Sequence, residues 1–442
     1  MISTRHLVTL GIMMELCYGL LYAVDSVEST LIIFIAVNAA TYLILVWAVW
    51  RCSVQENEPA RPATLAIIFG FGMLFRFTLV PHLPVASDDI YRYLWDGRVA
   101  THGINPYAYP PQDPHLASLA TADLPSKVNF PWMHSIYPPL AQVLFLISAS
   151  LFGPSPAGFK LLLTLLEGAT LLVITRFITR FSLRPWLLLL YAWSPVPIMY
   201  YSLDGHIDAL GIPFLMLFLY LVMTTRYVAG GISLGLSALA KFYPLFVVPF
   251  LLRLGRRANG AWLPLIPIVL LGVGYVAYYE PSGGLVSSLI TFNAHWEFNA
   301  PIFSVLLMLF RDNGPAHLTS ALLFIAWLGW LFFADKPIGE KVFLAFLGFI
   351  MLGPLVHPWY LGWLAALLTV RWSTAVFVLL GLSNLSNIVV YRYRTGGGWV
   401  DDPLLMLLEY VPFFILFIWE LMRGARSGVV FESETPGLRD GG

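Results

Sequence analysis

Residues 30–50 read TLIIFIAVNAATYLILVWAVW and carry no charged side chain. A helix that crosses the hydrocarbon core of a bilayer needs about 20 mostly apolar residues, and this stretch meets that requirement. The same composition runs through the chain, because 58% of the 442 residues are hydrophobic and only 11% are charged. A soluble domain carries about 25% charged residues. The sequence therefore predicts an all-α, polytopic integral membrane protein.

Similar apolar runs recur up to residue 422, although several are short or interrupted by proline. We expect about 11–13 transmembrane helices in a single membrane domain over residues 1–422. The polar, glycine-rich segment 423–442 is expected to be a disordered cytoplasmic tail. No pair of matching halves is visible, which argues against a transporter built from repeats. The net charge is zero, so the composition does not favour nucleic-acid binding.

Orientation follows from the lysines and arginines of short loops, which gather on the cytoplasmic side. Such positions flank three connections and the C-terminal end: Arg51 and Arg61; Arg176, Arg180 and Arg184; Arg253, Arg256 and Arg257; Arg423 and Arg426. This arrangement places the N-terminus inside and the 82–136 loop outside. Two apolar runs then lie where an odd number of crossings is needed; one resolution is that 137–153 only dips into the membrane, and 228–252 could likewise form a re-entrant hairpin with Lys241 at the outer face.

The largest polar island lies between two apolar runs, at residues 86–111, ASDDIYRYLWDGRVATHGINPYAYPP. Ser87 and Asp88 are typical of a helix N-cap, so we expect an amphipathic helix from there to about Thr101. Spacing at i, i+3, i+4 and i+7 gives this helix one polar face, made of Asp89, Arg92, Tyr93 and Asp96. Its opposite side, with Ile90, Leu94 and Val99, would suit a membrane surface.

Two interpretations of this helix stay open. It could be an interfacial helix with a solvated polar face and no chemistry of its own. Alternatively, Asp89 or Asp88 acts as a general base at the water–membrane boundary, with a pKa raised by partial burial among tyrosine and tryptophan rings.

Other polar groups lie at the edges of apolar runs. His134 and Tyr137 precede the helix that Pro138 and Pro139 should start. Asp204, His206 and Asp208 lie between two apolar helices, where ionisable groups are costly and usually functional. Hard carboxylates suit Mg²⁺ or Mn²⁺, so a metal site is conceivable from Asp204, His206 and Asp208, or from Asp88 with the same two aspartates; capping of a helix by Asp204 is the simpler alternative.

Lys241 stands alone within a long apolar stretch and needs an anionic partner. A lipid phosphate is the natural candidate, because lysine binds phosphate as a point charge; the alternative is a lysine that reaches the headgroups by snorkelling. Two further clusters, Phe292–Asn299 and His357–Tyr360, combine histidine with aromatic rings. Such rings can anchor a helix at the interface or provide a platform for a sugar.

Seven motifs occur in one order: DDIYRYLWDGR (88–98), GINPY (103–107), YPPL (137–140), DGHIDAL (204–210), AKFYP (240–244), HWEFN (295–299) and HPWY (357–360). The ordered set resembles the GT-C membrane glycosyltransferases, over about residues 85–365. It is most similar to bacterial α-1,6-mannosyltransferases and glycosyltransferase family 87, and more distantly to the eukaryotic enzyme that adds the first mannose to GPI anchors.

The resemblance implies an inverting enzyme of the bacterial inner membrane that moves a hexose such as mannose from a polyprenyl-phosphate donor to a lipid or glycan acceptor. The catalytic acid of the family maps onto Asp89 or Asp88, and its common Asp-x-Asp spacing is replaced here by adjacent aspartates. Whether a metal is used stays open.

We expect Arg92, Lys241 and His206 to bind the donor phosphate. The remaining candidates for substrate binding are Asp96, Arg98, Tyr107, His134, Tyr137, Asp204, Asp208, Tyr243, His295, Glu297, Asn299, His357, Trp359 and Tyr360. Two alternatives remain at this point: a transporter or flippase of lipid-linked sugars that uses the same carboxylates for proton coupling, and an assembly subunit without catalysis.

Overall fold

The computed structural model describes residues 4–24, 26–53, 62–257, 260–281 and 283–423. These residues form helices joined by loops, with one isolated β-bridge and no strand among them. The all-α membrane architecture predicted from the sequence is therefore confirmed. Most of the tail expected at 423–442 lies outside the described residues.

Seven helical segments of the described chain are long and apolar enough to cross a membrane. They are α1 (Thr4–Gly19) continued by η1 (Leu20–Ala23), α2 (Val27–Ser53), α3 (Pro62–Leu79), α6 (Pro156–Arg180), α15 (Asn313–Phe333), α18 (Thr374–Leu382) with η7 (Ser383–Ser386) and α19 (Asn387–Arg394), and α20 (Pro403–Met422).

Five apolar helices are shorter: α5 (Pro139–Phe152), α9 (Asp208–Met223), α10 (Tyr227–Ala240), α12 (Leu265–Ala277) and α14 (Pro301–Phe310). The other helices are α4 (Asp89–Thr101), η2 (Pro114–Leu119), η3 (Pro185–Leu188), α7 (Leu189–Ala192), α8 (Pro195–Pro197), η4 (Ile198–Leu203), η5 (Tyr243–Val247), α11 (Phe250–Arg257), α13 (Gly284–His295), α16 (Ile338–Leu352), η6 (Pro358–Tyr360) and α17 (Leu361–Leu367).

Proline and short polar residues set many of the helix starts. Proline is favoured in the first turn because its missing N–H has no intrahelical partner there, and it stands at the start of α3, α5, α6 and α20. Before α6, the hydroxyl of Ser155 accepts from the Gly158 amide at 3.1 Å. Before α20, the carboxylate of Asp402 accepts from the Leu404 amide at 2.9 Å. These caps stabilise helix ends that lie at loops.

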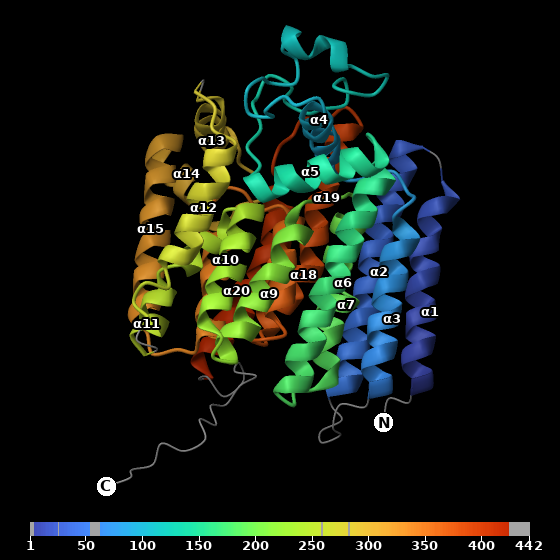
Figure 1. The fold of residues 1–442 in the computed structure, drawn as a ribbon. Helices are drawn as coiled ribbons and strands as arrows, with labels where there is room; N and C mark the ends of the chain where they lie inside the picture. Colours follow the sequence, from blue (N-terminus) through green and yellow to red (C-terminus); the bar gives the residue numbers. More distant parts are fainter. Residues whose placement is uncertain (1–3, 25, 54–61, 258–259, 282, 424–442) are drawn as a thin grey trace.

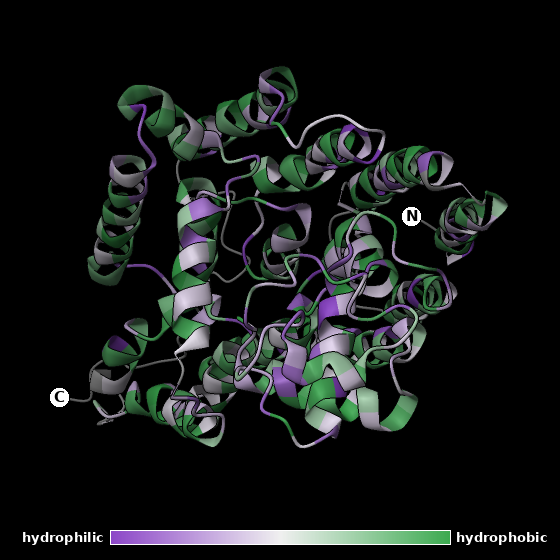
Figure 2. Cartoon of the chain, turned by 90° about the horizontal axis from the view of Figure 1, so that it is seen from above, coloured by the Kyte–Doolittle hydropathy of each residue, from purple (hydrophilic) through white to green (hydrophobic). Residues whose placement is uncertain are grey.

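The two ends of the bundle differ. The termini lie at one end, whereas α4 and the long α4–α5 connection, with η2, lie at the other (Figure 1). Helix α5 lies across the bundle, nearly at right angles to α3 and α6 (Figure 1). Seen from that end, the helices around the periphery are largely hydrophobic, as expected of a surface that faces lipid (Figure 2).

Helix α4 begins and ends close to its predicted limits, but its apolar side does not lie on the membrane. Ile90, Leu94 and Val99 are each at most 2% exposed, because α4 packs on α5 and α6. At Gly97 the approach is so close that a Cβ atom would lie 2.4 Å from the Phe145 carbonyl oxygen. The α4 helix is therefore part of the protein core, and the expectation of a membrane-lying helix was wrong.

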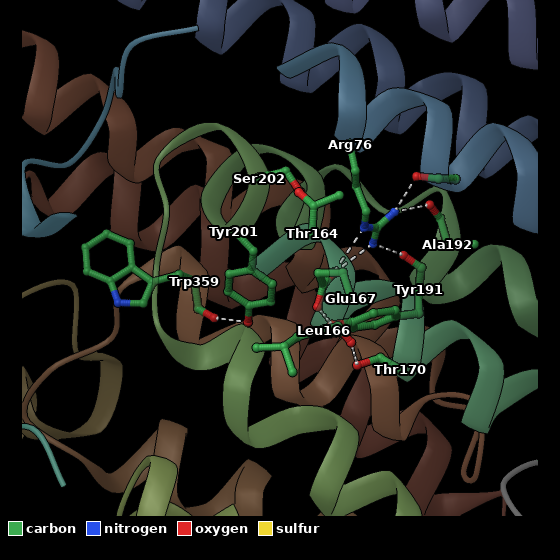
Figure 3. A network of polar contacts seen from close by, with 11 residues as sticks. Arg76, Thr164, Leu166, Glu167, Thr170, Tyr191, Ala192, Tyr201, Ser202 and Trp359 are labelled. Atoms are coloured by element: carbon green, nitrogen blue, oxygen red, sulfur yellow. Dashed lines mark hydrogen bonds and ion pairs between the residues drawn. The ribbon is translucent and has the colours of Figure 1, made fainter. Parts of the chain in front are cut away.

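A buried ion pair joins three helical segments inside the bundle (Figure 3). Arg76 of α3 and Glu167 of α6 are both fully buried, with 3.0 Å between Nη2 and Oε2. The guanidinium also donates to the Gly72 and Ala192 carbonyls at 2.9 and 2.8 Å. The hydroxyl of Tyr191 donates to the other oxygen of Glu167 at 2.6 Å. Nearly every donor and acceptor of this network is satisfied within the protein.

Candidate active site

The predicted polar face of α4 contacts one segment of the following loop, position by position. Asn129 lies against Asp89. Three residues further along α4 and four further along the loop, the Arg92 guanidinium donates to the Met133 carbonyl at 2.9 Å. The carboxylate of Asp96 accepts from the Ser135 hydroxyl at 2.5 Å. The polar face therefore fixes the loop on α4, and only its first turn remains partly open.

Arg92 and Asp96 contact each other as well as the loop. Their side chains form an ion pair at 2.9 Å and are 6% and 3% exposed. Gln142 of α5 completes this cluster through hydrogen bonds to Asp96 and Ser135. Two buried atoms of the cluster find no partner within the described chain, the second terminal nitrogen of Arg92 and the side-chain oxygen of Gln142. The cluster ties α4 to the start of α5, so these two residues have a structural role besides any contact with substrate.

Asp88 and Asp89 start α4 and share one amide. The Asn129 Nδ2 donates to Oδ1 of Asp88 at 3.0 Å and to Oδ1 of Asp89 at 2.9 Å. Asp88 occupies the N-cap position without a side-chain cap bond. Instead the Ser87 hydroxyl accepts from the Asp89 amide, at 3.3 Å. The two carboxylates are thus held side by side at the mouth of the site.

The pKa of Asp89 lies above its usual range. Burial, followed by the neighbouring charge of Asp88, raises its pKa to about 6, while Asn129 and the more distant Lys241 oppose the rise. Its side chain is still 28% exposed, so part of the carboxylate is accessible to a small molecule. A carboxylate with a pKa near neutrality is suited to general-base catalysis.

Asp204 is used by the backbone of a different segment. Its Oδ1 accepts from the amides of Val85 and Ala86 at 2.6 and 3.2 Å. Burial raises its pKa to about 7, and these hydrogen bonds oppose the rise. Gly205 follows with φ +82°, a conformation that favours glycine, and a Cβ there would lie 2.6 Å from Ile90. Asp204 therefore fixes the chain that leads into α4.

Lys160 supports the same junction from α6. Its ammonium is fully buried and donates to the carbonyls of Leu79, His82 and Leu203. These carbonyls belong to the end of α3, the following turn and the end of η4. A cation at the carbonyl end of a helix is favourable, so Lys160 joins three chain segments immediately behind the site.

Asp208 and Lys241 form an ion pair across the start of α9 and the end of α10, with 2.6 Å between Oδ2 and Nζ. The other oxygen of Asp208 accepts from the indole of Trp363 at 2.7 Å. The ammonium of Lys241 also lies over the rings of Tyr243 and Tyr360, at 5.1 and 4.8 Å from their centroids. An ammonium has three N–H bonds, and the pair with Asp208 uses one of them.

A tryptophan between two histidines lines the other side of the site. The ring centroids of His206 and His357 lie 3.8 and 4.0 Å from that of Trp359, at interplanar angles of 17° and 8°. Two rings cannot occupy the same face at these distances, so the indole lies between the imidazoles. Phe298 extends the stack from His357 at 4.9 Å. The Trp359 carbonyl accepts from Tyr201 at 2.7 Å (Figure 3).

His206 connects this stack with the acid pair. Its Nδ1 lies 3.7 Å from Oδ2 of Asp89, too long for a direct hydrogen bond. Its Nε2 is buried and has no partner among the described residues. Burial and the charge of Lys241 hold the pKa of His206 well below its usual range. The imidazole is therefore neutral, and can donate or accept a hydrogen bond but brings no positive charge.

Tyrosines close the space between these groups. Tyr137 packs edge-on against Tyr93 at 4.9 Å, and Tyr243 lies 5.4 Å from Tyr360. The structure thus brings Asp88, Asp89, Tyr137, His206, Asp208, Lys241, Tyr243, His357, Trp359 and Tyr360 together from five separate parts of the sequence. An acid, a neutral imidazole, an ammonium and aromatic walls form one polar recess.

Three other predicted residues hold the outer loop. Arg98 donates to the Leu119 carbonyl at 2.6 Å. Tyr107 is buried, with its hydroxyl donating to the Tyr137 carbonyl. The His134 amide donates to Ser288 at 3.0 Å, and its ring packs on Gly284. Burial and the charge of Arg92 lower the His134 pKa. These side chains position the loop around the recess.

The 295–299 motif contacts the loop beside the acid pair through Trp296, whose ring lies edge-on to Phe130 at 4.6 Å, whereas His295 is exposed. Glu297 is 3.9 Å from His317. The side-chain nitrogen of Asn299 donates to Glu409 at 3.0 Å, and its backbone N–H donates to Asp401 at 2.9 Å. The adjacent Phe298 forms the isolated β-bridge with Leu355. This motif therefore supports the segment that presents His357 and Trp359.

The carboxylates proposed as metal ligands have other partners. Asp204 accepts backbone N–H groups and Asp208 pairs with Lys241, as described above. Within the part of the chain that the structure describes, no group of three or more His, Cys, Asp or Glu side chains is arranged to hold a metal ion. Asp88, Asp204 and Asp208 are therefore not arranged as a metal site in the described part of the chain.

Asn129, Lys160 and Trp363 are residues of the site that sequence reasoning missed. Asn129 lies in a loop without periodicity, and Trp363 and Lys160 lie in runs that read as ordinary membrane helices. The only available signal was Lys160, a lone charge in an apolar helix, which is usually functional or paired.

The chain was compared with known protein families and with curated proteins. No curated protein matches it. Residues 13–255, more than half of the chain, match the family model of the N-terminal domain of alpha-(1->6)-mannopyranosyltransferases. The match includes Asp88, Asp89, Asn129, His206 and Lys241, and ends before the His357–Tyr360 segment. The chain therefore belongs to the alpha-(1->6)-mannopyranosyltransferase family of membrane glycosyltransferases.

Proposed function

We propose that this protein transfers a hexose, mannose in the first instance, from a polyprenyl-phosphate donor to a lipid-linked or glycan acceptor, with inversion at the anomeric carbon. The proposal rests on Asp89, a partly exposed acid whose pKa is raised to about 6. It lies beside the neutral His206, and the charge of Lys241 acts on it. The family supplies the glycosyl-transfer chemistry.

In the proposed reaction Asp89 takes the proton of the acceptor hydroxyl. The acceptor oxygen attacks C1 of the sugar as the bond between C1 and the phosphate oxygen breaks. The electron pair leaves with the polyprenyl phosphate, and the proton stays on Oδ2 of Asp89 until it is released to solvent. A positioned base typically contributes about 10²–10⁴-fold to such a step.

Lys241 is the group best suited to the leaving phosphate. Charge develops on that phosphate in the transition state, and a fixed cation in a site of low polarity stabilises it strongly. Asp208, which accepts a hydrogen bond from the Trp363 indole, holds the ammonium in place, while Tyr243 and Tyr360 flank it. The Arg92 guanidinium is already bonded to Asp96 and to the Met133 carbonyl, so we assign Arg92 to positioning the loop.

His357 and Trp359 of the stack are partly exposed and suit contact with the sugar through their ring edges. The buried Nε2 of His206, which has no partner among the described residues, is available for a sugar hydroxyl. In this arrangement the stack orients the ring so that C1 faces the acceptor oxygen held by Asp89.

The outer, extracytoplasmic face of a bacterial inner membrane is the proposed place of reaction. Helix α4, which carries the acid pair, lies at the end of the bundle opposite to the start of α1 and the end of α20 (Figure 1). The described arginines Arg176 and Arg180 end α6 near the termini side, and positively charged loops favour the cytoplasm. The recess then opens to the compartment where lipid-linked sugars are displayed.

Purified protein in lipid vesicles should transfer radiolabelled sugar from synthetic polyprenyl-phosphate hexoses or pentoses to short mannoside acceptors. We expect polyprenyl-phosphate mannose to be used and the product linkage to be inverted relative to the donor, as measured by NMR. Transfer from a nucleotide sugar alone would contradict the donor class. Movement of the donor across the vesicle without transfer would instead favour a flippase.

A further inference from the structure

Asn129 lies between the two carboxylates at the start of α4. Its side-chain nitrogen is 3.0 Å from Oδ1 of Asp88 and 2.9 Å from Oδ1 of Asp89. An amide nitrogen carries two N–H donors, so one is directed at each acid. Because an ionised carboxylate only accepts hydrogen bonds, the nitrogen and not the oxygen of Asn129 must face this pair.

The loop is built to keep this amide in place. Phe130, the next residue, has φ +47°, a backbone conformation that is costly for a bulky side chain. Met133 donates its amide to the Phe130 carbonyl at 3.0 Å and receives the Arg92 guanidinium on its own carbonyl. Ser135 is tied to Asp96. The loop is thus anchored on α4 one and two helical turns beyond Asp89.

The two oxygens of Asp89 have different surroundings as a result. Oδ1 is engaged by Asn129, whereas Oδ2 faces His206 Nδ1 across 3.7 Å. A gap of this length leaves Oδ2 without a strong partner. Oδ2 is therefore the oxygen that an acceptor hydroxyl can approach.

We infer that Asn129 is a positioning residue, which fixes the Asp89 carboxylate so that Oδ2 receives the acceptor proton and which favours the ionised form of Asp89. The inference rests on the proposed function, because it assigns a role relative to the base of that reaction. A hydrogen bond to the charged form of an acid favours that form, and one shared donor reduces the repulsion between neighbouring carboxylates.

The titration of Asp89 depends on every charged or titratable group around it. These are Asp88 and Tyr93 on its own helix, Tyr137 before α5, His206 and Asp208 around the start of α9, Lys241 after α10 and Tyr360 of η6. Lys241 and Asn129 favour the ionised acid, and Asp88 and Asp208 oppose it. Loss of the Asn129 amide therefore leaves Lys241 as the principal group that favours ionisation.

The test is the pH profile of kcat/KM for full-length protein in vesicles. For Asn129→Ala we expect the acidic limb to move up by about one pH unit, the scale of a lost hydrogen bond to a charged group. Near pH 6 we expect a loss of about fivefold, which approaches about tenfold at lower pH and recovers at higher pH, with an unchanged KM for the donor. Asn129→Asp adds a third carboxylate and should move the limb further.

Ser126→Ala is the matched control. This serine is in the same loop, is exposed, and bonds only to the nearby Asp123 carbonyl, so its profile should equal that of the parent. Retained donor binding shows that a variant is folded. An Asn129→Ala loss that is the same at every pH, or an Asn129→Asp limb at the parental position, would overturn the inference. Full activity of Asp89→Asn would instead overturn the proposed function.

Discussion

Two charged clusters in this protein use similar groups in opposite ways. The pair of Arg76 and Glu167 lies within the bundle, fully buried, and six hydrogen bonds or ion contacts satisfy it. The cluster around Asp89 lies at the end of the bundle, is partly exposed, and leaves the Nε2 atom of His206 without a partner in the described chain. A satisfied charged network stabilises a fold, whereas an incomplete one is arranged for a ligand that completes it.

The largest effect on activity is expected when Asp89 is neutralised. Asp89 belongs to the partly exposed cluster, called the open cluster here, whereas Arg76 and Glu167 form the closed cluster. Asp89→Asn keeps the shape of the side chain but cannot accept the proton, so transfer should fall by about 10²–10⁴-fold. Donor binding and thermal stability should stay close to those of the parent. Asp88→Asn is the control and should lose much less. Reversed results for the two variants would make Asp88 the base.

The closed cluster should respond in stability and not in chemistry. Glu167→Gln leaves the buried charge of Arg76 uncompensated, which typically costs about 3–5 kcal/mol. Thermal unfolding in detergent measures the loss. The double variant Arg76→Met with Glu167→Leu removes both charges and should recover most of it, because hydrophobic replacement of a buried pair is often neutral. A stable Glu167→Gln protein that has lost only transfer would break the comparison.

Lys241 should give an intermediate effect, because it belongs to the open cluster yet has one buried partner. Lys241→Ala should weaken use of the donor by about 10–100-fold, the range for a lost charge-assisted contact. Lys241→Arg should recover part of it by keeping the charge. Adding Asp208→Asn to Lys241→Ala should restore stability without restoring donor use. An unchanged KM for the donor would leave Lys241 with a structural role only.

The smallest effect requires no substitution. Asp89 must be ionised to act as base, and its pKa is raised to about 6. The value of kcat/KM should therefore be level above that pH and fall by about tenfold per unit below it. Stability runs the other way: because folding raises this pKa, the contribution of Asp89 to stability is present at low pH and is lost as the pH rises through about 6. A limb near pH 4 would show that the pKa of the titrating acid is not raised.

Local sequence patterns predicted the limits of the helices better than they predicted which other helices each one packs against. The limits of α4 and its polar face follow from helical spacing, and the start of α5 follows from two prolines. Spacing cannot say what a face contacts, so the packing of Ile90 and Leu94 on other helices was missed. The pair of Arg76 and Glu167 is 91 positions apart in the chain, and each residue reads alone as an isolated charge in a membrane helix.

The site shows the same limit. The order of the motifs indicated which segments converge, and Asp89, His206 and Lys241 do lie in one recess. Their partners were not predictable: Asp208 was a candidate ligand, yet it holds Lys241. Whether a polar residue faces a substrate or another side chain depends on contacts between distant segments, and a single sequence does not contain them.

The close crossing of α4 and α5 at Gly97 has a mechanical consequence. Helices that touch backbone to backbone cannot slide or tilt past each other without collision, so the acid pair and the start of α5 should move as one rigid body. Any opening that admits a long polyprenyl chain then falls to the opposite wall, where Lys241 follows a helix end and Trp359 stands on the short η6 turn. If the protein transfers sugar as proposed, Asp89 stays in place and the wall around Lys241 and Trp359 moves.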